Sequence, residues 1–188
     1  MPEIKPIIVF LACLSFTLFV GDDTSYAEAQ TPEAFVTQQV EQLLTIINEE
    51  TERGSQEALQ RQSALRTAVR ALIDFEELSR RALGTHWDPL SAAQQQQFVT
   101  LLRNLIETNY TVKMGQRSLG EDFTVEYGDT LVRLPNALVR GQLSHDQKVT
   151  DIELFLLQSD SGWTVYDVVT DDVSLLETYA ESFDEIIG

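Results

Sequence analysis

Cysteine and histidine are scarce in this chain of 188 residues, which has one cysteine, Cys13, and two histidines, His86 and His145. Disulfide frameworks and cysteine-based metal sites need several cysteines, so the sequence argues against both. Basic residues are also few, because 13 Lys and Arg stand against 30 Asp and Glu, for a formal net charge of −17. Nucleic acids and anionic lipid headgroups attract clustered Lys and Arg, so the charge balance disfavours both as binding surfaces.

The first 29 residues have the pattern of a secretory signal peptide. Lys5 gives a positive start, residues 7–20 form an unbroken run of low polarity, and the small residues Ala27 and Ala29 supply cleavage sites. A membrane anchor is the competing interpretation, but a spanning helix needs about 20 apolar residues and this run is shorter. A lipoprotein site at Cys13 is a second alternative, which the continuing apolar run disfavours. We expect residues 1–29 to be a cleaved signal peptide and residues 30–188 to form a single domain.

The rest of the chain has enough apolar side chains for a packed core, since the sequence is 43% hydrophobic with nine Phe and five Tyr. Apolar residues first recur at helical spacing. After Gly120 the period changes to two, and turn residues separate the successive strands. A further helix is expected from about Ser174. This order predicts an α+β fold: N-terminal helices packed on a mostly antiparallel twisted sheet of about four strands, with a closing C-terminal helix.

Several helix boundaries can be placed from capping residues. Thr31 is expected to cap the first helix, with Pro32 at its first position. The pattern Asp74-x-x-Glu77 predicts a capping box for a short helix that Gly84 ends. A similar box begins at residue 91.

The strand expected over residues 149–158 has apolar residues on both of its faces. Ile152, Leu154 and Leu156 share one face, while Phe155 and Leu157 lie on the other. A half-exposed antiparallel strand normally alternates between apolar and polar residues. The pattern therefore indicates that both faces are covered or that one lines a cavity.

A search for catalytic motifs is mostly negative. There is no H-E-x-x-H metal motif and no G-x-S-x-G nucleophile motif in the chain. Tyr166 and Asp167 allow an acid–base interpretation, but we favour Asp167 as the anchor of the following turn and Tyr166 as a core residue. We expect His86, His145 and Asp167 not to be catalytic.

Two segments nevertheless resemble a known family. They are DFEELSRRALGTHW, from Asp74 to Trp87, and GWTVYDVV, from Gly162 to Val169, followed by a Val-Ser turn and a closing helix with Phe183. Together they are similar to the MlaC-type periplasmic phospholipid-binding proteins, also called the toluene-tolerance family, over about residues 32–187. One departure is Asp172, which stands where the family has Gly. The other is the end at residue 188, where the family usually continues into a further helical segment.

The resemblance implies a periplasmic lipid carrier that needs no cofactor. It would take phospholipid, or a hopanoid-like lipid, between an outer-membrane lipoprotein complex and an inner-membrane ABC transporter with an MCE-domain protein. Lipid class, the number of lipids bound and transport direction stay open. The alternatives are a small-molecule enzyme on a cone-like α+β fold and a periplasmic adaptor that binds only protein.

The lipid tails are expected between the concave face of the sheet and the helices, in an apolar cavity. On the strands we predict lining by Val139, Ile152, Leu154, Leu156, Tyr166 and Val168. On the helices we predict lining by Phe98, Leu102 and Tyr110. Val173 matches the family's Val after the turn and is expected at the cavity mouth.

Overall fold

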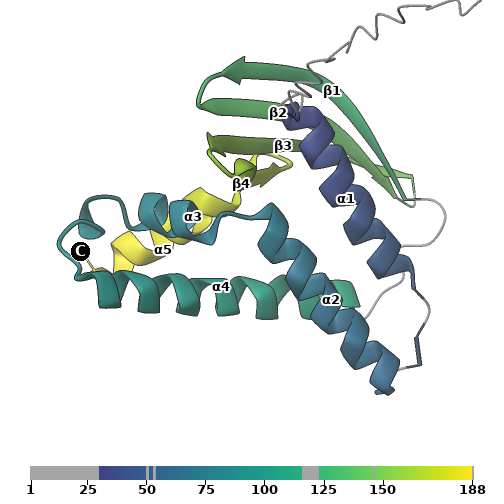
Figure 1. Ribbon diagram of the computed structural model, residues 1–188, viewed down its shortest axis with the longest axis horizontal. Helices are drawn as coiled ribbons and strands as arrows, with labels where there is room; N and C mark the ends of the chain where they lie inside the picture. The colour runs from purple at the N-terminus through teal and green to yellow at the C-terminus, as the bar shows by residue number, and fades with distance from the viewer. Residues whose placement is uncertain (1–29, 50, 53, 116–122, 146, 188) are drawn as a thin grey trace, which may run out of the picture.

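The computed structural model describes residues 30–187 except 50, 53, 116–122 and 146, and leaves the side chains of residues 110–115 undescribed (Figure 1). The expected signal peptide therefore lies outside the described residues. The elements are α1 (Pro32–Asn48), α2 (Gln56–Leu72), α3 (Phe75–Leu83), a short 3-10 helix η1 (Gly84–His86), α4 (Ala92–Gly115), β1 (Thr124–Arg133), β2 (Asn136–His145), β3 (Lys148–Ser159), β4 (Gly162–Thr170), β5 (Val173–Ser174) and α5 (Leu175–Ile187).

The predicted α+β class is confirmed, with helices first, then a meander of strands, then a closing helix. The sheet has five strands in the order β1-β2-β3-β4-β5, and each neighbouring pair is antiparallel. The prediction of about four strands missed β5. Its two residues are too few to show a period in the sequence, and it forms only by pairing with the end of β4.

The capping predictions are confirmed in the helices. The Thr31 side chain accepts a hydrogen bond from the N–H of Ala34, at 3.2 Å, at the start of α1. Asp74 accepts one from the N–H of Glu77, at 2.9 Å, and so begins α3. Gly84 ends α3 with a φ of +51°, a left-handed conformation that glycine adopts without a steric penalty.

The helices pack on one face of the sheet, which we call the inner face. In the register of β2 and β3, Val139 lies opposite Leu154 and Gly141 lies opposite Ile152. A side chain at Gly141 would place its Cβ only 2.7 Å from the carbonyl oxygen of Glu126. The glycine therefore lets β1 and β2 approach closely at this point.

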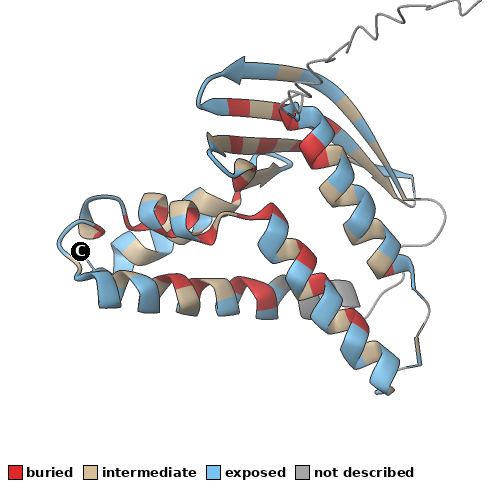
Figure 2. Cartoon of the chain, in the orientation of Figure 1, coloured by how far each residue is buried: buried red, intermediate tan, exposed pale blue. Residues whose placement is uncertain are grey.

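One hydrophobic cluster joins the inner face to four helices (Figure 2). Its buried members are Phe35, Val36, Leu72, Ile73, Phe75, Leu78, Leu83, Trp87, Val99, Leu102, Ile106, Ala137, Val139, Leu154, Leu156, Trp163 and Val165. In the described part of the chain, no helix is long and apolar enough to cross a membrane.

Candidate functional site

The inner face of β2 and β3 brings three of the predicted lining residues together. Val139, Leu154 and Leu156 are 0%, 5% and 0% exposed and belong to the central cluster. Phe155 and Leu157, on the other face of β3, are only partly buried. The structure therefore divides these residues between two faces as the sequence indicated, and the face that carries Leu154 and Leu156 meets the helices.

Leu102 of α4 joins the same cluster and is also buried. The helical residues predicted from the sequence all belong to α4, whereas α1, α2 and α3 contribute to the cluster as well. Phe35 and Val36 come from α1, and Leu78 comes from α3. The helical spacing of their apolar residues was visible in the sequence, but it does not reveal which helix faces the sheet.

A ring of partly buried apolar residues surrounds this cluster. Its members come from α1, α2, α4 and α5, from the bend before α4 and from the sheet: Val40, Leu43, Val69, Leu90, Phe98, Tyr127, Val168, Leu175, Tyr179 and Phe183. Phe98 and Val168 are therefore rim residues of the apolar interior. These residues keep some contact with solvent while they pack against the buried cluster.

A β-bulge in β4 lies between Val165 and Asp167, with Tyr166 as the extra residue. Val165 lies opposite Leu156, but after an extra residue in β4 it is Val168 that lies opposite Leu154. The bulge places Val168 on the inner face with Val165. The ring of Tyr166 lies instead 6.2 Å from that of Phe155 and 3.9 Å below the guanidinium of Arg81.

The last three predicted residues lie at the margins. Ile152 is buried opposite Gly141, toward the start of β3. Val173 is 60% exposed, in the short strand β5 that leads into α5. Tyr110 is part of α4, but its side chain lies outside the described residues.

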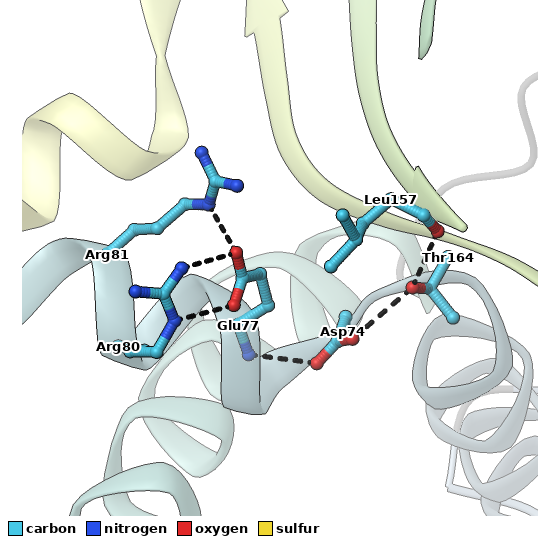
Figure 3. Close-up of polar contacts among 6 residues, drawn as sticks. All are labelled: Asp74, Glu77, Arg80, Arg81, Leu157 and Thr164. Atoms are coloured by element: carbon cyan, nitrogen blue, oxygen red, sulfur yellow. Dashed lines mark hydrogen bonds and ion pairs between the residues drawn. The ribbon is translucent and has the colours of Figure 1, made fainter. Parts of the chain in front are cut away.

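A polar network fixes α3 against β4 (Figure 3). Asp74 receives a hydrogen bond from the hydroxyl of Thr164 at 3.3 Å, and its own N–H donates to the carbonyl of Val165 at 2.8 Å. One turn further on, Figure 3 shows Arg80 and Arg81 both pointing toward the Glu77 carboxylate, at 2.7 and 2.6 Å. These hydrogen bonds lower the pKa of Glu77 from its ordinary value of 4.5, and the hydrogen bond from Arg80 contributes most.

The buried carboxylates also hold elements together. Glu107 of α4 receives two hydrogen bonds from Arg70 of α2, at 2.6 and 2.9 Å. Asp167 receives hydrogen bonds from the hydroxyl of Ser174 and the N–H of Leu176, at the start of α5. This arrangement agrees with the expectation that Asp167 anchors the turn.

The two histidines lie on different elements. His86 of η1 is 3.8 Å from the carboxylate of Asp184, and the ring of His145 in β2 is 6.1 Å from that of Phe123. Among the described residues, no three His, Cys, Asp or Glu side chains are placed to hold a metal ion.

A surface cavity of about 510 Å³ lies over the polar side of β1 to β4. Its carboxylates come from Glu126, Asp129, Asp151, Glu153 and Asp172. Arg140 also lines it and is paired with Glu153 at 2.7 Å. Burying carboxylates against hydrocarbon is costly, so this cavity does not suit an acyl chain.

The fold and the site define an α+β domain in which helices cover one face of an antiparallel sheet over a rimmed apolar interior. The chain belongs to the MlaC protein family, whose model matches residues 37–188.

A solved structure supports the same fold. It is the phospholipid-binding protein of Ralstonia solanacearum in complex with a phospholipid, 23% identical, with a TM-score of 0.70, covering 85% of this chain and 87% of that one. A cystatin-like protein from Ruminococcus gnavus is 15% identical over 83% of this chain and 43% of that one. Its TM-score of 0.27 is too low to indicate a shared fold. The search of curated proteins finds no match.

Proposed function

We propose that this protein is a periplasmic lipid carrier that shuttles phospholipid between the outer membrane and an inner-membrane ABC transporter complex. The observation that carries the proposal is the apolar interior with its half-buried rim, in a chain of the MlaC family. The likeness to a protein solved with a phospholipid adds support for the ligand class.

The physical need for such a carrier follows from the cost of wetting hydrocarbon. At about 0.8 kcal/mol per methylene, an acyl chain of roughly 16 carbons would cost about 12 kcal/mol in water. A carrier must therefore cover the tails, while the headgroup can stay hydrated. Val139, Leu154, Leu156 and Leu102 are the side chains that we assign to the covering of the tails.

The proposed partners follow from family membership. They are an outer-membrane lipoprotein complex on one side and an ABC transporter with an MCE-domain protein on the other. A transfer protein must release as well as bind, so its contacts with the headgroup should be few. The protein is proposed to act without a cofactor and without catalysis, after its signal peptide has been removed in the periplasm.

Native mass spectrometry of protein secreted from the full-length gene and purified without detergent tests the proposal. We expect a mass increment that matches one or more phospholipids, which solvent extraction and lipid mass spectrometry then identify. The same measurement after extraction gives the matched empty control. Protein that is reproducibly empty when isolated from lipid-rich cells would contradict the proposal.

A further inference from the structure

Helix α5 is tied by buried hydrogen bonds at its first turn and is held more loosely over its C-terminal half, where the exposed carboxylate of Asp184 lies 3.8 Å from His86. Its first turn is tied to β4 through Asp167, and its backbone packs closely against α3 and β4. Close backbone contacts with α4 are fewer. At the far end Ile186 and Ile187 are 80% and 48% exposed, so little apolar surface is buried there.

An aromatic contact joins this loosely held half of α5 to α4. The rings of Phe98 and Phe183 meet edge to face, with centroids 5.1 Å apart and an interplanar angle of 70°. Tyr179 stacks on Phe183 from one turn earlier in α5, at 6.1 Å. All three side chains are only partly buried and pack on the central cluster.

The α4 surface beside this contact is apolar and open to solvent. Leu101 and Leu105 follow Phe98 by three and seven residues, so they lie on nearly the same side of the helix. They are 60% and 45% exposed, whereas Leu102, directly beside them, is 2% exposed. Apolar side chains of α4 therefore extend from the solvent-exposed surface at Leu101 and Leu105 past Phe98 to the buried cluster at Leu102.

We propose that acyl chains enter and leave between α4 and α5, and that the Phe98–Phe183 contact closes this passage. This inference rests on the proposed function. Leu101 and Leu105 receive the chain first, and α5 swings away from α4 while its N-terminus stays fixed at Asp167. Elements that move for binding are drawn from the least stable parts of a fold, which fits the loosely held half of α5.

Cross-linking the two helices tests the passage. The full-length gene would carry Phe98→Cys and Phe183→Cys, together with Cys13→Ala in the expected signal peptide. The purified protein is loaded with a phospholipid bearing a fluorescent acyl chain, and release to vesicles of phosphatidylethanolamine and phosphatidylglycerol is followed by stopped flow. The rate is measured before and after a short bismaleimide joins the two thiols.

The release rate of this variant should rise without the cross-link and fall with it. Without the cross-link, release should be roughly two- to tenfold faster than in the unmodified protein, because an aromatic pair contributes about 0.5–1.5 kcal/mol. With the cross-link, release should slow by at least about tenfold. The control pair is Gln142→Cys with Asp151→Cys, cross-strand neighbours outside the passage, and linking it should leave the rate unchanged.

Equal release before and after cross-linking would overturn the passage while leaving lipid carriage intact. If the unmodified protein neither holds nor transfers the labelled lipid, the proposed function fails and the passage with it. Circular dichroism checks that the double variant is folded. If it is not, Phe98→Leu takes its place, since it keeps an apolar side chain but loses the ring pair, and an unchanged release rate would overturn the inference.

Discussion

The carboxylate of Asp167 lies 2.7 Å from the hydroxyl of Ser174, and both side chains are buried. The other carboxylate oxygen receives the N–H of Leu176 at 2.9 Å, and the Ser174 hydroxyl accepts the N–H of Glu177. Two side chains thus satisfy backbone donors in the first turn of α5, which no preceding turn of the helix can satisfy. The pair fixes the end of α5 about which we propose that the helix moves.

Replacing Asp167 should therefore destabilise the protein. Asp167→Ala is expected to lower the free energy of unfolding by about 1.5–3 kcal/mol, the range for hydrogen bonds to a charged group. Urea denaturation followed by circular dichroism measures the change. Glu181→Ala, at an exposed position of the same helix, is the matched control and should stay close to the unmodified protein. Equal stability of the two variants would show that the Asp167 hydrogen bonds contribute little.

The turn between β4 and β5 should become more stable with the family's residue. Asp171 and Asp172 have φ of +47° and +65°, as a tight turn of the primed type requires. Glycine adopts this conformation at less cost than aspartate, so Asp172→Gly should raise the free energy of unfolding by about 0.5–1 kcal/mol. Asp160→Gly, in the turn before β4, has no positive φ to relieve and should bring no gain. Thermal and urea unfolding of both variants would decide the point.

Local signals in the sequence predicted much of the fold, because they act within a few residues. Thr31, Asp74 and Gly84 cap helices where expected, and the spacing of Ile152 and Leu154 placed them on one face of their strand, where both are buried. What local sequence signals could not predict was which distant segments pair or pack against each other.

The bulge in β4 illustrates that limit at the candidate site. It changes which residues of the strand face inward, so the inner-face positions continue from Val165 to Val168 rather than to Asp167. The extra residue is recognised only when β4 is paired with β3, and periodicity within one strand cannot reveal it. The two-residue strand β5 escaped prediction for a similar reason.

The ion pairs of Glu77 should make stability depend on acid pH. Because Arg80 and Arg81 lower the pKa of Glu77 in the folded protein, the stability that they contribute is present above the ordinary value of 4.5. It is lost as the pH falls through the lowered folded pKa. The difference in unfolding free energy between the unmodified protein and Glu77→Gln should therefore be largest near neutral pH and shrink in acid. Glu76→Gln, at an exposed position, is the control, and a difference independent of pH would contradict the prediction.

Val173 tests the cavity mouth that the sequence predicted, which lies beside the fixed end of α5 and is separate from the passage proposed at Phe98 and Phe183. It is 60% exposed in β5, so a glutamate there should cost the fold little. If the cavity mouth lies beside it, as predicted, the new carboxylate would have to lose hydration against an acyl chain, at a cost of several kcal/mol. Val173→Glu should therefore leave the melting temperature nearly unchanged while the bound phospholipid per protein falls strongly.

Val132→Glu is the matched control for Val173→Glu, since Val132 is also a strand valine, 49% exposed, but lies near the end of β1, at the opposite end of the sheet from β5. Its lipid content should equal that of the unmodified protein. Both contents are measured by solvent extraction and mass spectrometry, with circular dichroism on the same samples. Normal lipid content in folded Val173→Glu protein would show that the mouth does not lie beside Val173, because a carboxylate facing an acyl chain there would lose hydration at a cost of several kcal/mol. Global unfolding of that variant alone would instead assign Val173 a structural role in joining β5 to α5.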